Sequence, residues 1–433
     1  MILSCKTKQK ITDKIDMGVL KMSEFHNIKI DEIEAYKVGT AEPSITYNPI
    51  NPKQLIAGSV LNNVYTSNDG GLTWTKSRLS SSQGVYGDPC LINDNKGHIY
   101  YLHLSNPEGK GHGSTSFLNQ IVIQRSDDVG KTWTDGTSIG KNEPKQQDKE
   151  WAITHPETGE IYVTWTEFDK YGSDDPNHKS RIRFSKSSDF GNTFSEAITI
   201  SELEGTALDG DTTTEGAVPA VDKDGNIYVA WSLNKKIYFD KSTDGGMTWQ
   251  DKDQIIATQP GGWDQSFSGT ERCNGMPVTV VDNSNTNHNG TIYVNWTDER
   301  NGSDNIDVFL IKSIDKGKTW SEPIKVNQDT TQTHQYFTWM TIDPITGYLY
   351  FVYFDRSRYA DNQTDVVLTV SKDAGETFQS YIISESPFTP RKGVFLGDYN
   401  NIIAYDGMVR PIWTRLDGNK KSVWTALIDA NKL

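Results

Sequence analysis

The chain has 433 residues and carries 57 acidic against 43 basic side chains, a formal net charge of -14 at pH 7. Such an acidic surface excludes nucleic acid and an anionic membrane surface as main partners. Aromatic residues make up 11% of the chain, glycine contributes 36 residues, and few segments have a helical period. This composition is typical of an all-β protein with many turns.

The first 27 residues are expected to precede the folded domain. Ile2, Leu3 and Ser4 before Cys5 resemble the end of a bacterial lipoprotein signal, in which the cysteine is lipidated. The charged start and the apolar run of a full signal are missing, so we interpret residues 1–27 as a truncated signal with a polar tether. The domain is then predicted to span residues 28–433, at the bacterial cell envelope, lipid-anchored at the outer membrane or secreted or periplasmic.

A motif of eight residues recurs six times, at intervals near 60 residues, and organises the chain. Each copy reads Ser-x-Asp-x-Gly-x-Thr followed by Trp or Phe, and the copies span residues 67–74, 126–133, 187–194, 242–249, 313–320 and 371–378. The Asp accepts backbone N–H groups of its own turn, and the Gly supplies a positive φ. The aromatic residue is expected to pack between neighbouring units. The repeat therefore predicts a repeat fold.

Each unit contains four predicted strands. Two strands joined by a Gly/Asn/Asp turn precede the motif, as in Asp222–Gly225 followed by Ile227–Trp231; a third leads into the motif and a fourth leaves it. Four antiparallel strands form the blade of a β-propeller. After the last motif come three further strands, and Ile33–Val38 is predicted to supply the fourth. We therefore expect a single seven-bladed β-propeller closed by an N-terminal strand, with six blades as the alternative.

The repeated motif resembles the Asp-box, or BNR repeat, of sialidases and related β-propellers. The resemblance covers the whole chain and implies the fold, but the box itself implies a structural turn rather than a site. Sialidases have six blades and an early Arg-Ile-Pro motif, whereas the corresponding place here reads Ala41–Ile45 without an arginine. The chain therefore resembles seven-bladed propeller polysaccharide lyases more than true sialidases.

Candidate site residues recur at matched positions, where the innermost strands begin around the channel. These residues are Glu42, Asp88, Asp148, Lys149, Glu150, Glu215, Arg272, His334, Tyr336, Asp398 and Tyr399. Acids, bases and phenols at matched positions indicate a site, although polar groups at a channel mouth also serve as solvated strand ends.

Two chemistries follow from these residues. His334 and Tyr336 lie on one side of a strand and are candidates for base and acid, with Tyr399 as a second phenol. Arg272, Lys149 and Arg356 are candidates for binding a carboxylate. Asp148 and Glu150 are candidates for carboxylate catalysis, and Asp88 and Glu215 for substrate contact. In the insertions, Trp263, Tyr171 and Phe267 are expected to form walls on which sugars stack.

The favoured function is a cell-surface enzyme that acts on acidic, uronate-containing saccharides by β-elimination, as a lyase or a dehydratase. The alternatives are a sialidase-like hydrolase with paired carboxylates and a non-catalytic propeller that binds glycan or protein. No cofactor is expected. Asp174–Asp175 and Asp209–Asp211 supply oxygen ligands of the kind that bind Ca²⁺, but neither group has a full ligand spacing. Cys5 is the lipidation candidate, Cys90 and Cys273 are expected to be buried thiols, and the protein is expected to be a monomer.

Overall fold

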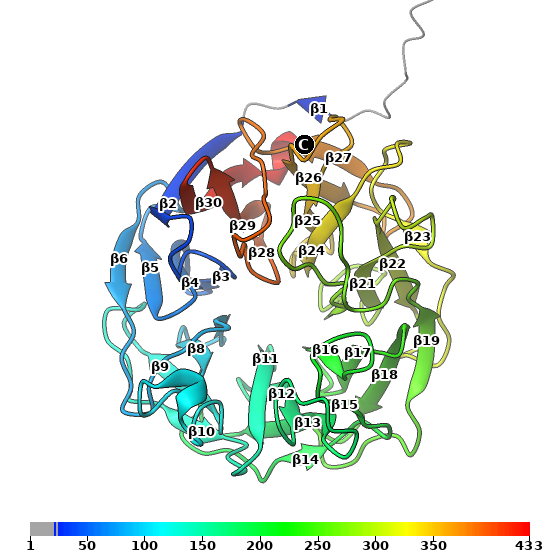
Figure 1. Ribbon diagram of the computed structural model, residues 1–433. Helices are drawn as coiled ribbons and strands as arrows, with labels where there is room; N and C mark the ends of the chain where they lie inside the picture. The colour runs from blue at the N-terminus through cyan, green and yellow to red at the C-terminus, as the bar shows by residue number, and fades with distance from the viewer. Residues whose placement is uncertain (1–20, 23–24) are drawn as a thin grey trace, which may run out of the picture.

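The computed structural model describes residues 21–22 and 25–433, and these form seven four-stranded sheets in a ring (Figure 1). The innermost strand of each sheet contacts the innermost strand of the next sheet, and the seventh contacts the first. The predicted seven-bladed propeller is therefore confirmed. Residues 1–20, including Cys5, and residues 23–24 lie outside the described part of the chain. No helix among the described residues is long and apolar enough to cross a membrane.

The blades follow the chain, each running from its innermost to its outermost strand. Blades one to four consist of β3 (Ser44–Asn48), β4 (Asn51–Ser59), β5 (Asn63–Ser67) and β6 (Thr75–Arg78); β7 (Cys90–Asn93), β8 (Ile99–Leu104), β9 (Ile121–Ser126) and β10 (Thr137–Ile139); β11 (Gln146–Thr154), β12 (Ile161–Phe168), β13 (Lys179–Ser187) and β14 (Ile198–Thr199); and β16 (Glu215–Val221), β17 (Ile227–Leu233), β18 (Lys236–Ser242) and β19 (Gln254–Thr258). Blades five to seven consist of β20 (Val278–Val281), β21 (Ile292–Asp298), β22 (Asp307–Ser313) and β23 (Ile324–Lys325); β24 (Gln335–Ile342), β25 (Leu349–Asp355), β26 (Asp365–Ser371) and β27 (Gln379–Ile382); and β28 (Asn401–Tyr405), β29 (Met408–Asp417), β30 (Lys420–Asp429) and β2 (His26–Glu34). The short strands β15 (Gly205–Thr206) and β1 (Lys21–Met22) pair with β13 and, in parallel, with β27, and 3₁₀ turns η1 and η2 span Gly111–Gly113 and Ala430–Lys432.

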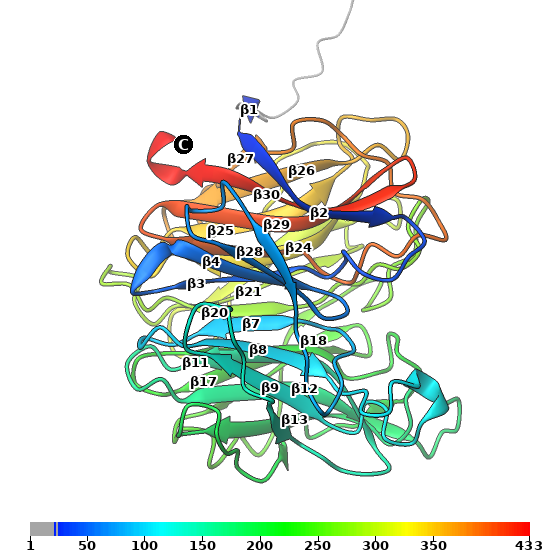
Figure 2. The ribbon, with the colours of Figure 1, turned by 90° about the vertical axis from the view of Figure 1, so that its left-hand side faces the viewer.

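The N-terminal strand closes the ring, but not over the predicted residues. Strand β2 pairs antiparallel with β30, from His26 opposite Leu427 to Glu34 opposite Lys420 (Figure 2). Only Ile33 and Glu34 of the predicted Ile33–Val38 strand are paired. The pairing stops because β30 begins at Lys420, so residues after Glu34 have no partner strand. They instead turn toward the mouth of the channel.

The core lies between the blades and also at the propeller axis, where the rings of Trp151, Trp339 and Tyr399, from blades three, six and seven, pack on one another. The second strands carry the motif Ile-Tyr-Val-x-Trp or a close variant, and Trp165, Trp231 and Trp296 in them are fully buried. Burying such a side chain contributes about 1.5–3 kcal/mol or more. Cys90 and Cys273 are buried free thiols, as predicted. The packed blades form a rigid scaffold, and the loops at the channel mouth are positioned on it to form a site.

All six repeated motifs adopt one hydrogen-bonded turn between the third and fourth strands of their blades. In the first copy, Ser67 Oγ donates to Asp69 and accepts the Gly71 N–H, while Asp69 also accepts the N–H and the hydroxyl of Thr73. The same four bonds recur in each other copy. These bonds account for each fixed residue of the motif, which therefore serves as a structural turn.

Acid is expected to weaken the fold through these turns. The hydrogen bond from the Thr73 hydroxyl is the largest influence on Asp69 and lowers its pKa to about 2, and Thr248 does the same for Asp244. Because the folded pKa lies below the unfolded value of 3.8, the stabilisation is complete above about pH 4 and is lost as pH falls toward 2. Urea unfolding at a series of pH values measures this loss. In an Asp69→Asn variant, the free energy of unfolding should fall less steeply between about pH 4 and pH 2 than in the wild type. An equally steep fall in the variant and the wild type would contradict this account.

Candidate active site

A backbone feature at the start of the innermost strands sets up the site. Glu42, Asp88 and Lys149 have positive φ angles of 51°, 51° and 54°. Two residues after each of them, at Ser44, Cys90 and Trp151, the innermost strand is paired with the second strand of its blade. In blade three this conformation lies in a β-bulge between Asp148 and Trp151. A left-handed conformation in a non-glycine residue costs about 1–2 kcal/mol. The same conformation occurs at Phe337, two residues before Trp339 in blade six, so it belongs to the repeat, and in each blade it redirects the side chains at the start of the innermost strand.

Lys149 joins carboxylates from three other blades at the channel mouth. Its Nζ donates to Asp398 and, at 3.2 Å, to Asp88 Oδ2, and lies 3.9 Å from Glu42 Oε1. The side chain of Lys149 is 4% exposed. Burial acts against its charge, but Asp398, Asp88 and Glu42 outweigh burial and raise the pKa of Lys149 well above its usual value. Lys149 is therefore a permanent cation at the base of the site.

Arg272 extends this cluster along the wall. Its Nη2 donates to Asp398 Oδ2 at 2.6 Å, and its Nη1 lies 3.3 Å from Asp209 Oδ2. The Tyr171 hydroxyl donates to the same Asp209 oxygen at 2.6 Å. Unlike Lys149, the Arg272 side chain is 32% exposed. The predicted cations Lys149 and Arg272 thus meet on one carboxylate, Asp398.

The carboxyl groups of this cluster have opposite pKa shifts. Burial acts to raise the pKa of Asp398, but Arg272 and Lys149 outweigh it and hold the pKa below its usual value. Burial, and after it the charge of Asp88, raises the pKa of Asp148 to about 7. The same two influences raise the pKa of Glu42 well above normal. At neutral pH the cluster therefore holds both ionised and protonated carboxyl groups.

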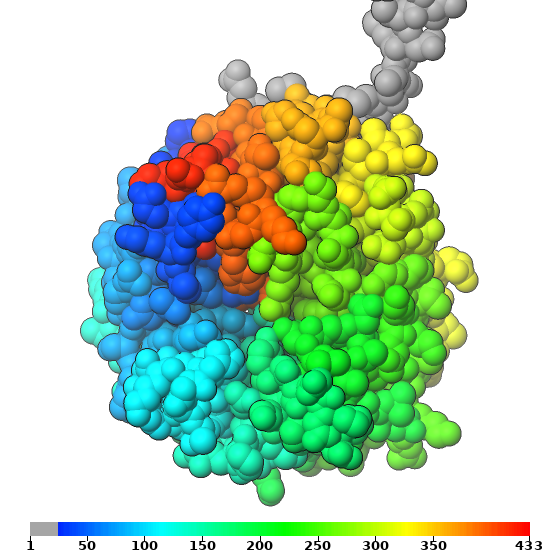
Figure 3. Space-filling view, in the orientation of Figure 1, coloured from blue at the N-terminus to red at the C-terminus, as the bar shows by residue number. Residues whose placement is uncertain are grey.

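These residues line one cavity of about 370 Å³. Figure 3 shows the hollow at the centre of the face that carries the long loops. The cavity is lined by Ala35–Gly39, Glu42, Val60, Leu61, Tyr86–Asp88, Leu104, His112, Phe117, Leu118, Asp148, Lys149, Tyr171, Arg272, Gly393, Phe395, Asp398 and Lys421. A second cavity, of about 270 Å³, lies along the innermost strands and has no charged residue among the described residues that line it. The first cavity is the candidate active site, and we call it the central cavity.

The predicted pair His334 and Tyr336 does not line the central cavity. Both rings pack on Phe267, with centroids 4.2 Å and 5.0 Å away. Burial, and then the charge of Arg356, lowers the pKa of His334 to about 4. Arg356 itself is buried, and donates to the Ser268 carbonyl at 2.7 Å. The insertion that carries Phe267 therefore covers these residues, and Arg356 fixes this insertion instead of facing a ligand.

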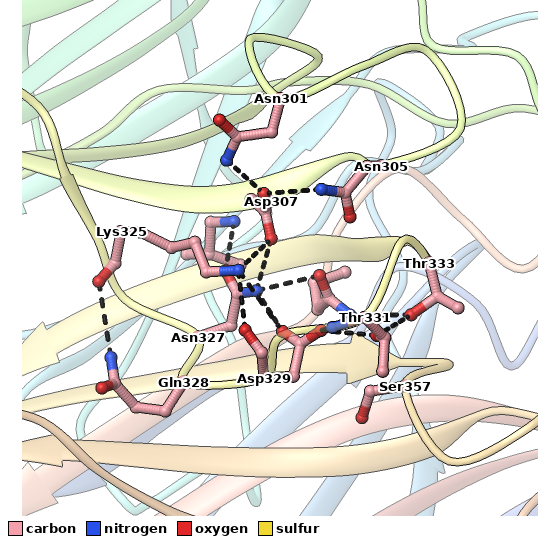
Figure 4. A network of polar contacts seen from close by, with 12 residues as sticks. Asn301, Asn305, Asp307, Lys325, Asn327, Gln328, Asp329, Thr331, Thr333 and Ser357 are labelled. Atoms are coloured by element: carbon pink, nitrogen blue, oxygen red, sulfur yellow. Dashed lines mark hydrogen bonds and ion pairs between the residues drawn. The ribbon is translucent and has the colours of Figure 1, made fainter. Parts of the chain in front are cut away.

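A polar network holds the segment that leads to His334 (Figure 4). Buried Asp307 accepts hydrogen bonds from Asn301 and Asn327, both at 2.6 Å, and from Lys325 at 3.1 Å. Asn327 also donates to Asp329 Oδ1 at 2.6 Å. The acids of this network are paired with side chains of the same blade, so the network is structural.

Four other predicted residues are buried away from the central cavity. The Tyr399 hydroxyl contacts the Pro89 carbonyl at 3.4 Å, and its ring packs on Trp151. Trp263 is 2% exposed, so it cannot offer a face on which a sugar stacks. Glu150 and Glu215 are fully buried without a hydrogen-bond partner for their carboxyl oxygens, and burial raises the pKa of both. None of these four side chains lines the central cavity, where its predicted role would place it.

The cavity contains residues that the sequence patterns did not single out as site members. His112 lies on the insertion after β8, and its ring packs against Phe117 and Tyr171. Tyr86 lies two residues before Asp88, and Lys421 is at the start of β30. Tyr171, which the sequence analysis named, also lines the cavity. His112 belongs to another long insertion, and that insertion was the available signal for it. Lys421 follows the turn of an ordinary hairpin, and no sequence pattern marked it as a site residue.

The suggested Ca²⁺ ligands have other partners. Asp209 bonds Tyr171 and Arg272, and Asp211 accepts the Asp264 N–H at 2.9 Å. Asp175 accepts the N–H of Asn177. Among the described residues, no group of three or more His, Cys, Asp or Glu side chains is placed to hold a metal ion.

No protein-family model matches the chain, and no curated protein matches its sequence. Among solved structures, an ulvan lyase of a new polysaccharide lyase family, bound to -[GlcA(1-4)Rha3S]-, has a TM-score of 0.56 at 13% identity over 92% of this chain and 96% of its own. A Hadza microbial sialidase has a TM-score of 0.48 at 13% identity over 88% of this chain and 74% of its own. An α-L-arabinofuranosidase of Fusarium graminearum has a TM-score of 0.49 at 15% identity over 80% and 98%. The likeness to the lyase confirms the predicted resemblance in fold.

Proposed function

We propose that the protein is a carbohydrate-active enzyme that hydrolyses acidic saccharides in the central cavity. Asp148 is the proton donor to the glycosidic oxygen, and Asp88 is the second carboxylate, acting as base or nucleophile. The observation that carries the proposal is the raised pKa of Asp148, about 7, caused by burial and by Asp88 in the same cavity. Glycoside hydrolysis requires a pair of carboxyl groups, one of which donates a proton to the leaving oxygen, and a carboxyl group with a raised pKa suits that role.

The surroundings of the two acids support these roles. The Lys149 Nζ donates to Asp88 Oδ2 at 3.2 Å, and the Lys149 backbone N–H donates to Asp148 Oδ1 at 3.0 Å, so Lys149 orients both carboxyl groups. The Asp88 side chain is 15% exposed, so it is accessible from the cavity. One residue, Lys149, therefore positions both acids, and Asp398 in turn fixes Lys149.

An acidic substrate is supported by the cations of the cavity. Lys37, Lys149, Arg272 and Lys421 line it, whereas two of its acids, Glu42 and Asp148, have raised pKa values. The cavity is lined by four basic and four acidic side chains, whereas the whole chain has 43 basic against 57 acidic ones, so the cavity is less acidic than the protein as a whole. The lyase with the similar fold was solved with a ligand that contains GlcA. The half-buried aromatic rings of Tyr86 and Tyr171 supply surfaces for sugar rings.

A product assay tests this proposal. The purified protein is incubated with uronate-containing and sialylated oligosaccharides and with neutral controls, and reducing ends, ultraviolet absorbance and product mass are measured. Release of reducing ends without the absorbance of an unsaturated uronate is the expected result. Retained binding without any product would instead indicate the non-catalytic propeller.

β-Elimination is the second candidate, and one observation favours it: His112 stacks on Tyr171 at 6.4 Å in the wall of the cavity. Burial, and then Asp148 and Asp209, raises the pKa of Tyr171, so this phenol keeps its proton and suits the role of acid, with His112 as base. This pair would replace His334 and Tyr336 in the predicted chemistry. An absorbing unsaturated product, or loss of one water without chain cleavage, would favour a lyase or a dehydratase.

A further inference from the structure

Lys421 is a buried cation at the wall of the central cavity. Its residue is 2% exposed, and its Nζ donates to the Phe395 carbonyl at 3.0 Å. Among the described residues, no carboxylate lies within 4.0 Å of this ammonium group, whereas Lys149 and Arg272 each pair with acids. An ammonium group has three N–H donors, so Lys421 has donors to spare beside the cavity.

This arrangement is energetically unfavourable in itself. A buried charge without a partner loses its hydration and gains no compensating ion pair. Burial lowers the pKa of Lys421 to about 8, and Glu42 offsets only part of this effect. Glu42 cannot serve as a full counter-ion at neutral pH because its own pKa is raised well above normal. The missing counter-charge is therefore expected from a ligand.

We propose that Lys421 is the anion-recognition residue of the central cavity, where it binds the carboxylate of a uronate in the substrate. The inference rests on the proposed function and deepens it, since it assigns the substrate's charged group to one side chain. A single ammonium with spare donors suits a singly charged oxyanion. Carboxylate and sulfate ester share this chemistry, and the experiment below separates them.

Calorimetric titration with saccharides tests the proposal on the whole protein. The probes are a glucuronate oligosaccharide, its methyl ester, the neutral glucose analogue and a sulfated oligosaccharide without uronate. For Lys421→Met we expect uronate affinity to fall at least about tenfold, with the weaker binding of the ester and the neutral analogue unchanged. Lys421→Arg should restore much of the lost affinity because it keeps the charge.

Lys420→Met is the matched control. Lys420 is the adjacent residue, but it is exposed and pairs with Glu34 at 2.6 Å. Its loss should change uronate affinity by less than about threefold. Lys421→Met should unfold at a temperature equal to or above that of the wild type, because it removes an unpaired buried charge and keeps the apolar stem. A purely structural lysine would show the opposite change.

Several outcomes would overturn the inference. If the wild type hydrolyses uronate substrates and Lys421→Met binds uronate with unchanged affinity, the inference fails and the proposed function stands. If Lys421→Met weakens only the sulfated ligand, the assignment to a carboxylate is wrong. If the wild type binds no uronate, this inference fails, whereas the proposed function fails only if the wild type also converts no other acidic saccharide.

Discussion

Replacing Asp148 with asparagine is expected to lower kcat by about 10²–10⁴-fold, the usual contribution of general acid catalysis. In the wild type, kcat/KM for an acidic substrate should fall as pH rises through about 7, because the active form of Asp148 is the protonated one and its pKa is about 7. The limb near pH 7 should be absent in Asp148→Asn, which keeps only the limb near pH 8 where Lys421 loses its proton. Steady-state kinetics across the pH range measure both effects.

Glu150→Gln is the matched control for this result. Glu150 lies two residues further along the same strand, is equally buried and has a raised pKa, but it does not line the central cavity. Its replacement by an isosteric neutral group should leave kcat within a few-fold of the wild type. Equal losses in Asp148→Asn and Glu150→Gln would show that the loss reflects burial and not proton donation.

Lys149→Met is expected to lower the free energy of unfolding by about 3–5 kcal/mol, because it leaves buried carboxylates without their cation. Asp398 would keep Arg272, whereas Asp88 would lose the only ion pair that the described residues give it. Activity should also vanish, since Lys149 orients both Asp88 and Asp148. Denaturant unfolding at neutral pH gives the change in stability.

An exposed lysine serves as the comparison for Lys149. Lys316 pairs with Asp224 at 3.0 Å, and its side chain is 52% exposed. Lys316→Met should cost less than about 1 kcal/mol, as is typical of surface ion pairs. If Lys149→Met is no more destabilising than Lys316→Met, the cluster at the channel mouth does not stabilise the fold as described.

The fold was predictable because its repeated turn is a local structure. Ser67, Asp69, Gly71 and Thr73 satisfy one another within one turn, so the residues reveal the geometry wherever they recur. The closing strand was predicted several residues too far along the chain. The residues that pair are set by where its partner β30 begins and ends, and the sequence of the closing strand itself does not show this.

The site was predictable only where it follows the repeat. Asp88, Asp148 and Lys149 were found because they occupy matched positions in adjacent blades, and Arg272 because it precedes the innermost strand of its own blade. The same logic failed for His334 and Tyr336, since an insertion from the preceding blade places Phe267 over them. Lys421 was missed because its position beside the cavity depends on the closure of the ring, which brings β30 next to the N-terminal segment.

The structure of Asp148→Asn bound to an uncleaved acidic oligosaccharide tests the central claim most directly. The account predicts sugar in the central cavity, with the glycosidic oxygen within hydrogen-bond distance of residue 148, Asp88 on the other side of the sugar, and a carboxylate against Lys421. A ligand bound instead beside His334 and Tyr336, or along the uncharged cavity at the innermost strands, would contradict it.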